Sequence, residues 1–201
     1  LTTLLFLKGQ GIETPKDLSG KKIGYTVPGL MDVLLDAFAT INDVRDYQAV
    51  NVGFAIVQSL TANKVDAVMG PFKTYETVTL AHKGYQAGYF ELEKWGIPDY
   101  DELIFITSRK NMQKNRRALA GFKRAIARAI ALMRHSPMQA FEDYLIQVPE
   151  ADRAIESDAF KLTRPYYATG QDLDIKRWQE FADLALKHGL IDKNVDVTDI
   201  L

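Results

Sequence analysis

The first hundred residues alternate short apolar stretches with segments whose apolar positions recur every three or four residues. Short runs rich in β-branched residues and bounded by glycine or proline indicate strands, whereas the longer period indicates amphipathic helices. We predict strands at 1–7, 21–27, 47–52, 65–69 and 86–92, and helices at 30–41, 54–62 and 74–82. This alternation is typical of βαβ units and of a mainly parallel sheet in an α/β protein.

The second half of the chain has a different pattern, which is mainly helical. One further strand is predicted at 103–107, and helix formers then dominate residues 113–148, where Ser136-Pro137 interrupts the run. Two more amphipathic helices are predicted at 150–163 and 172–188.

The predicted strands at 1–7 and 103–107 flank the α/β segment, as the two strands of a hinge between two lobes would. We therefore expect residues 21–100 to form an inserted α/β lobe. Residues 1–20 and 101–201 are expected to form the returning part of the other lobe, which would be incomplete. The apolar, strand-like start of the chain also leads us to expect that a further N-terminal stretch is missing.

Composition and motifs narrow the possible chemistry. The formal net charge is −1, no cysteine is present, and no apolar run reaches the roughly 18 residues that a membrane span needs. Disulfides, thiolate metal sites and a cysteine nucleophile are therefore excluded. The three histidines have no metal-ligand spacing, and neither a nucleophile motif nor a phosphate-binding motif occurs. The sequence thus predicts no catalytic residue, no metal and no cofactor.

A basic stretch from Arg109 to Arg134 contains nine Lys or Arg and no Asp or Glu. Nucleic-acid binding usually places aromatic residues among such charges, but Phe122 lies on the apolar side of the predicted helix. We interpret the cations as the solvated face of a helix packed on a core. A surface that docks a partner remains the alternative, and we expect no nucleic acid as a partner.

The loops 27–32, 51–54 and 70–76 are predicted to share one edge, because the carboxyl ends of parallel strands meet there. The first and third of these loops open helices, whose N-termini favour anionic or carbonyl atoms of a ligand. Phe72, Tyr75 and Glu76 bring two aromatic rings and one carboxylate to this edge, and Trp95 follows the strand at 86–92.

Two interpretations of these side chains stay open. An aromatic slot with a single carboxylate suits a flat, hydrogen-bonding or cationic heterocycle. Alternatively, Phe72 and Tyr75 pack beneath their loop while Glu76 stabilises the start of the following helix. Residue types alone favour neither.

Three segments resemble a known family. GIETPKDLSGKKIGYTVPG at 11–29 resembles the lobe-entry segment of the NMT1/THI5-like group of ABC-transporter substrate-binding proteins. VDAVMGPFKTYE at 65–76 and KWGIPDYDELIF at 94–105 are similar to its pyrimidine-binding members. The resemblance covers essentially the whole chain. It implies a periplasmic-binding-protein type II (Venus-flytrap) fold, a periplasmic or extracytoplasmic location, and an ABC-transporter permease as partner.

The resemblance also implies a ligand and a set of contacts. The ligand would be a small aminopyrimidine precursor of thiamine, and Gly70, Phe72 and Glu76 match a glycine–aromatic–glutamate spacing of the pyrimidine binders. Phe72 would stack on the ring, and Glu76 would bond the aminopyrimidine edge. The remaining predicted ligand-binding residues are Tyr75, Pro28, Gly29, Leu30, Asn51 and Trp95.

Other functions within the same fold remain alternatives. A binder of sulfonate, taurine or nitrate would need a cation in the slot, and Lys73 is the obvious candidate. Members that synthesise the pyrimidine are enzymes with a cysteine-rich motif, which this chain lacks. The effector domain of a regulator would need an upstream DNA-binding segment. Phe72 also stands where we expect Tyr, so a phenolic hydrogen bond is missing.

Overall fold

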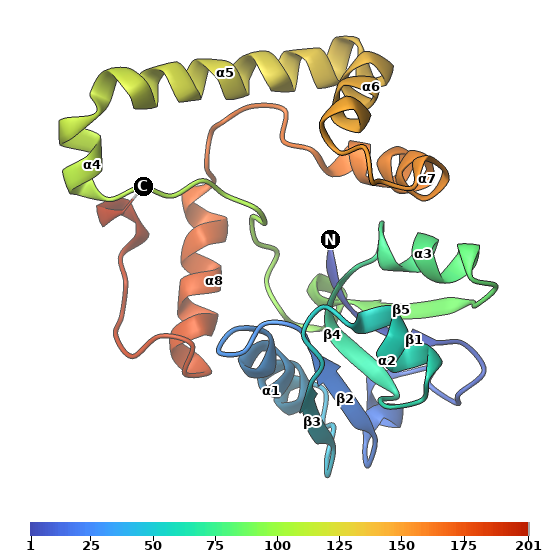
Figure 1. The fold of residues 1–201 in the computed structure, drawn as a ribbon. Helices are drawn as coiled ribbons and strands as arrows, with labels where there is room; N and C mark the ends of the chain where they lie inside the picture. The colour runs from blue at the N-terminus through green and yellow to red at the C-terminus, as the bar shows by residue number, and fades with distance from the viewer. Residues whose placement is uncertain (201) are drawn as a thin grey trace. The chain divides into compact units, whose positions relative to one another are not determined.

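The computed structural model describes residues 1–200 and divides into two compact units (Figure 1). The sheet unit comprises Leu1–Tyr100 together with the C-terminal segment from Asp174, and the helical unit comprises Asp101–Leu173. Each unit has its own internal packing.

The sheet unit is built on five strands in the order β3-β2-β4-β1-β5. The bounds are Thr2–Leu7 for β1, Lys22–Tyr25 for β2, Gln48–Asn51 for β3, Ala67–Phe72 for β4 and Ala87–Glu91 for β5. β2 pairs in parallel with β3 and β4, as the alternation of strands and helices predicts. β1 runs antiparallel to both of its neighbours, β4 and β5. β4 and β5 therefore point the same way as β2 and β3.

The first strand belongs to this sheet, although the sequence grouped residues 1–20 with residues 101–201. All six residues of β1 are buried, and its hydrogen bonds run to the strands on both sides. A strand that is covered on both faces is mainly apolar, which explains the continuous hydrophobic run at residues 4–7.

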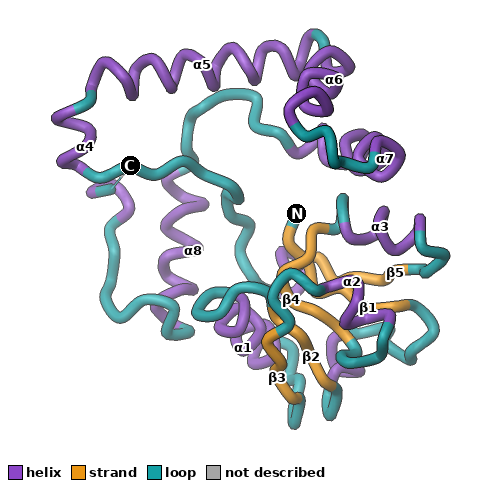
Figure 2. The backbone as a smooth tube through the Cα atoms, viewed as in Figure 1, coloured by secondary structure: helices purple, strands orange, loops and turns teal. Residues whose placement is uncertain are grey.

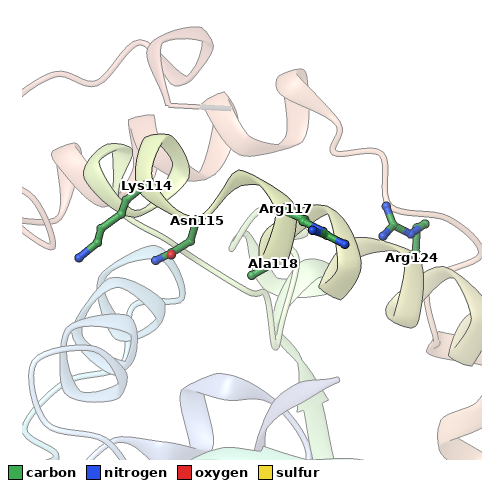
Figure 3. A pocket seen from close by; sticks show the side chains of 5 residues that line it. All are labelled: Lys114, Asn115, Arg117, Ala118 and Arg124. Atoms are coloured by element: carbon green, nitrogen blue, oxygen red, sulfur yellow. The ribbon is translucent and has the colours of Figure 1, made fainter.

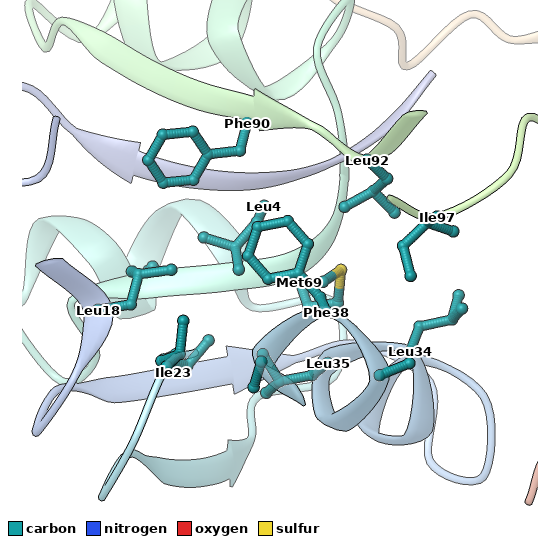
Figure 4. Close-up of a cluster of buried hydrophobic side chains, with 14 of the residues drawn as sticks. Leu4, Leu18, Ile23, Leu34, Leu35, Phe38, Met69, Phe90, Leu92 and Ile97 are labelled. Carbon is teal, nitrogen blue, oxygen red and sulfur yellow. The ribbon is translucent and has the colours of Figure 1, made fainter. Parts of the chain in front are cut away.

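Helices cover the two faces of the sheet (Figures 1 and 2). On one face, α1 (Met31–Ile41) packs on a cluster formed by alternate residues of the strands. Figure 4 shows Phe38 of this helix among Leu4, Met69 and Phe90 of the strands. On the other face, α2 (Ile56–Thr61) and α3 (Glu76–His82) pack on the intervening residues. This is the three-layer arrangement expected of α/β proteins.

The C-terminal helix α8 (Ile175–Lys187) is part of the sheet unit. Leu184 joins the cluster under α1, and the ring of Phe181 lies 4.7 Å from that of Tyr100. Short 3₁₀ turns complete the unit at Pro15–Leu18 (η1), Leu92–Trp95 (η2) and Val197–Asp199 (η4).

The helical unit contains four α-helices and a short 3₁₀ turn within residues 101–173. They are α4 (Arg109–Lys114), α5 (Arg116–His135), α6 (Pro137–Gln147), α7 (Arg153–Thr163) and η3 (Arg164–Tyr166). The predicted interruption at Ser136-Pro137 separates α5 from α6, with the proline in the first turn. Only Phe141 and Ala159 are buried in this unit, and Phe141 stacks on Phe160 at 5.1 Å.

The strand predicted at 103–107 is absent, and that prediction is wrong for the described residues. The segment has no regular structure, Leu103 has a positive φ of 57°, and Leu103 and Ile106 are 81% and 86% exposed. A β-branched run forms a strand only when a neighbouring strand accepts its hydrogen bonds, and residues 1–200 supply none here.

The basic helix α5 also differs from its prediction, because it is not packed on a core. None of its residues is buried, and Phe122 is 45% exposed while its ring meets that of Phe105 at 4.9 Å. Its cations are solvated as expected. The described residues of the helical unit, however, contain no strand that could cover its apolar side.

Candidate functional site

The candidate site lies at the edge of the sheet where β2, β3 and β4 end. Because these three strands are parallel, the loops that follow Tyr25, Asn51 and Phe72 leave from the same edge. β5 ends at this edge too. The edge is where α/β proteins bind ligands, since loops can approach a ligand there without disturbing the sheet.

The end of β4 is held by close contacts with two threonine side chains. Gly70 has a φ of 119°, and a Cβ at this position would lie 2.2 Å from Thr26 Oγ1, so β4 approaches the Thr26 side chain where only glycine fits. On the other side, the Thr3 hydroxyl donates to the Pro71 carbonyl at 3.1 Å. These contacts fix the start of the turn that carries Phe72 and Glu76.

The turn itself is closed by Glu76. The Phe72 amide donates to Glu76 Oε2 at 2.7 Å, and the hydroxyl of Thr77 donates to the Lys73 carbonyl. Glu76 is the first residue of α3, where a negative charge is favoured by the helix dipole. Glu76 thus does stabilise the helix start, as one of the two sequence interpretations proposed.

Burial changes the acidity of the Glu76 carboxyl. Desolvation raises its pKa above the ordinary 4.5, while the amides of Phe72 and of Glu76 itself act in the opposite direction. Carboxyls with raised pKa values are common at functional sites, although structural groups can show them as well. A carboxylate can accept about four hydrogen bonds, so the bond from Phe72 leaves capacity for a ligand.

Aromatic residues lie in the same turn and in the loop after β3. Phe72 is half-buried, and Tyr75, the N-cap of α3, is 40% exposed. The loop after β3 adds Phe54, which is 84% exposed and was not singled out from the sequence. Phe54 could have been identified from the sequence, because it lies in one of the three loops predicted to share this edge. Asn51, in the same loop, accepts the Gly53 amide at 3.0 Å through its side-chain oxygen.

The loop after β2 supplies the other predicted contacts. Pro28, Gly29 and Leu30 are exposed, and Leu30 is the N-cap of α1. The Met31 amide donates to the Val27 carbonyl at 2.8 Å, which closes the turn. The structure thus brings these residues to the same sheet edge as Asn51 and the β4 loop.

Trp95 does not lie with the loops that follow β2, β3 and β4. Its ring meets the edge of Phe90 at 5.7 Å, and its carbonyl accepts from the side chain of Asn42, which caps the C-terminal end of α1. Leu30 caps the opposite end of the same helix, and 11 residues of α-helix span roughly 16 Å. Trp95 therefore packs against the core beside the far end of α1.

The only cation of the β4 turn is already paired. Lys73 Nζ bonds Glu91 Oε1 and lies 4.0 Å from Glu93 Oε1, while Lys94 Nζ bonds the other oxygen of Glu91. The two lysines hold the pKa of Glu91 below its ordinary range, with Lys73 as the main cause. This group of four side chains carries no net charge.

The helical unit has a separate surface hollow of about 520 Å³ where α4 meets α5 (Figure 3). Its lining includes the cationic side chains of Lys114, Arg117 and Arg124. It shares no residue with the predicted site.

Residues 1–200 contain neither a candidate metal site nor a candidate membrane span. No group of three or more His, Cys, Asp or Glu side chains there is arranged to hold a metal ion. Within the same residues, no helix has both the length and the apolar character needed to cross a bilayer.

The chain is similar in sequence to several known proteins. A protein of Haemophilus influenzae whose name assigns it to thiamine biosynthesis is 32% identical over 96% of this chain. A formylaminopyrimidine-binding protein of Halalkalibacterium halodurans is 26% identical over 99% of it. Relatives at lower identity include 4-amino-5-hydroxymethyl-2-methylpyrimidine phosphate synthases, such as one from Legionella pneumophila at 22%. The chain spans 62% and 63% of the length of the first two relatives.

Comparison with solved structures confirms the predicted fold class. An alkanesulfonate-binding protein of Xanthomonas axonopodis pv. citri matches with a TM-score of 0.69 at 20% identity, covering 98% of this chain and 68% of that protein. The chain thus has the type II fold of periplasmic binding proteins, which is the fold of the substrate-binding components of ABC importers.

The family predicted from the three sequence segments is confirmed as well. The family described as "NMT1/THI5 like" matches residues 1–140, which is more than half of the chain. This chain belongs to the NMT1/THI5-like family.

Proposed function

We propose that this chain is part of the substrate-binding component of an ABC importer and that it binds a small aminopyrimidine precursor of thiamine. The observation that carries the proposal is the partly desolvated Glu76 carboxyl, held next to Phe72 at the carboxyl edge of the sheet. The relative named as a formylaminopyrimidine-binding protein supports this choice of ligand.

The proposed contacts follow from the geometry of the turn. The Phe72 amide fixes the Glu76 carboxylate through Oε2, so the remaining acceptor sites have a defined direction. An exocyclic amino group and a protonated ring nitrogen would donate to these sites as a charge-assisted pair. The face of Phe72 would stack on the ring, with Tyr75 and Phe54 as further apolar walls. The exposed loops at Pro28–Leu30 and Asn51 would close around the ligand.

Binding without chemistry is part of the proposal, together with an extracytoplasmic location and a permease as partner. Some relatives are named as synthases, so the alternative is an enzyme that makes the pyrimidine. The absence of cysteine favours a binding protein, because the synthesising members are expected to carry a cysteine-rich motif.

A thermal-shift experiment on the intact protein tests the proposed ligand. A ligand at 100 times its Kd stabilises the folded state by about 2.7 kcal/mol, which is readily detected. We expect 4-amino-5-hydroxymethyl-2-methylpyrimidine or its formylamino precursor to raise the melting temperature, and taurine and nitrate to leave it unchanged. Stabilisation by taurine or nitrate alone would overturn the proposal, as would turnover of a pyrimidine-forming reaction.

A further inference from the structure

Lys73 occupies an unusual position for a lysine in a binding loop. It lies between Phe72 and Glu76 in the turn after β4, yet its side chain is only 9% exposed. The Lys73 side chain reaches past β1 to the end of β5. There its ammonium bonds Glu91, whose side chain is 17% exposed. The ion pair therefore joins the candidate ligand turn to a strand two places away in the sheet.

The carboxylates beside Lys73 compensate the charge of its nearly buried ammonium. A nearly buried ammonium is costly unless a counter-charge and hydrogen bonds compensate it. Glu91 supplies both, and its second oxygen is bonded by Lys94, whose side chain is 68% exposed. Glu93, at 4.0 Å, adds a second negative charge beside Lys73. An anionic ligand approaching Lys73 would meet two carboxylates and would have to displace one of them.

We propose that Glu91 is a specificity-determining residue, which neutralises Lys73 and so makes the site select neutral or cationic heterocycles over small anions. The proposal rests on the proposed function, since it concerns the same turn. In this view Glu91 contacts no ligand. It acts through Lys73. Without it Lys73 would keep only Glu93, at 4.0 Å, and its ammonium could then bind an anion such as sulfonate or nitrate.

The test measures anion binding by isothermal titration calorimetry on the intact protein, with methanesulfonate and nitrate as probes. The wild type is expected to bind neither at millimolar concentration. Glu91→Gln is expected to gain at least tenfold in affinity for one of them and to retain a cooperative thermal transition. If Glu91→Gln does not fold, Glu91→Ser leaves room for water beside the ammonium and tests the same point.

Matched variants show whether the gain passes through Lys73. The double variant Lys73→Met/Glu91→Gln lacks the cation and is expected to lose the gain. Lys94→Gln breaks only the exposed half of the network and should behave as the wild type. Unchanged anion affinity in folded Glu91→Gln or Glu91→Ser would overturn the inference, and so would a gain that persists in the double variant. Because the probes are anions, this result is independent of whether the wild type binds a pyrimidine.

Discussion

At the residue scale, the candidate site depends on how Glu76 is held. Its carboxyl is partly buried at the first position of α3 and accepts the Phe72 amide. A ligand that donates two hydrogen bonds to this carboxylate would replace the water lost on burial. The Glu76→Gln substitution keeps one acceptor for the Phe72 amide and removes the charge, so it isolates the charge from the local structure.

We expect Glu76→Gln to weaken aminopyrimidine binding by about 1–3 kcal/mol, the usual loss for a hydrogen bond to a charged group. Calorimetric titration measures this difference. Glu156→Gln is the matched control, since Glu156 lies in the first turn of α7 in the helical unit. Equal affinity of Glu76→Gln and the wild type would remove Glu76 from the site.

The raised pKa of Glu76 also predicts a dependence of stability on pH. A carboxyl whose pKa is raised by folding binds its proton more tightly in the folded state. Its favourable contribution is complete below the ordinary pKa of 4.5 and is lost as the pH rises through the raised value. The wild type should therefore lose stability relative to Glu76→Gln as the pH rises above 4.5. Urea unfolding at several pH values checks this, and a constant difference between the two proteins would contradict it.

Gly70 gives a third prediction at this scale. Gly70→Ala combines a positive φ with a Cβ only 2.2 Å from Thr26 Oγ1, so β4 must move away from the Thr26 side chain. We expect a loss of about 1–3 kcal/mol in unfolding free energy, together with weaker ligand binding. Gly84→Ala serves as control, because Gly84 has a φ of 81° but no atom within 4 Å of its added Cβ. A similar loss in both variants would show that only backbone strain matters.

The sequence predicted the residues of the turn better than their roles. The spacing from Phe72 to Glu76 indicated a carboxylate next to an aromatic ring, and the structure joins the two through the Phe72 amide. The partner of Lys73 could not be foreseen, because Glu91 lies 18 positions later and becomes a neighbour only through the antiparallel pairing of β1 and β5. Trp95 was grouped with the slot for a similar reason: its sequence position does not reveal which end of α1 it meets.

At the element scale, the periodic segments were predicted well, whereas only one of the two isolated apolar runs forms its predicted strand. Every predicted strand and helix from residue 21 to residue 92 is present, with boundaries that differ by a few residues. The runs at 1–7 and 103–107 have similar composition, yet the first is the inner strand β1, paired on both sides, and the second is irregular. The difference lies in their neighbours, since β4 and β5 accept the hydrogen bonds of β1.

Leucines in these two runs should respond very differently to truncation. Leu4 is fully buried in β1, so Leu4→Ala is expected to cost about 2–5 kcal/mol of unfolding free energy. Leu103 is 81% exposed, so Leu103→Ala should change stability by no more than about 0.5 kcal/mol. Chemical denaturation of the two variants of the chain compares them directly. A large loss in Leu103→Ala would mean that residues 103–107 are packed after all.

At the scale of the whole molecule, buried side chains are distributed very unevenly. The sheet unit holds both large clusters of the core, whereas the helical unit buries only Phe141 and Ala159. Because burial of apolar area is the main source of stability, the helices of residues 101–173 gain little from packing within the described chain. Their apolar positions, such as Phe105 and Phe122, stay largely in contact with water.

Hydrogen exchange of the chain of residues 1–201 should reveal this difference. Amides of β1 and β4 are expected to exchange only by global unfolding, because their strands are paired on both sides within the core. Amides of α4 and α5 should open locally and exchange faster by on the order of 100-fold or more, which corresponds to roughly 3 kcal/mol of protection. Mass spectrometry of peptides from the two units measures the contrast within one sample, so no separate reference protein is needed. Equal protection of α5 and β4 would show that the two units unfold together and that stability in this chain does not follow the distribution of its core.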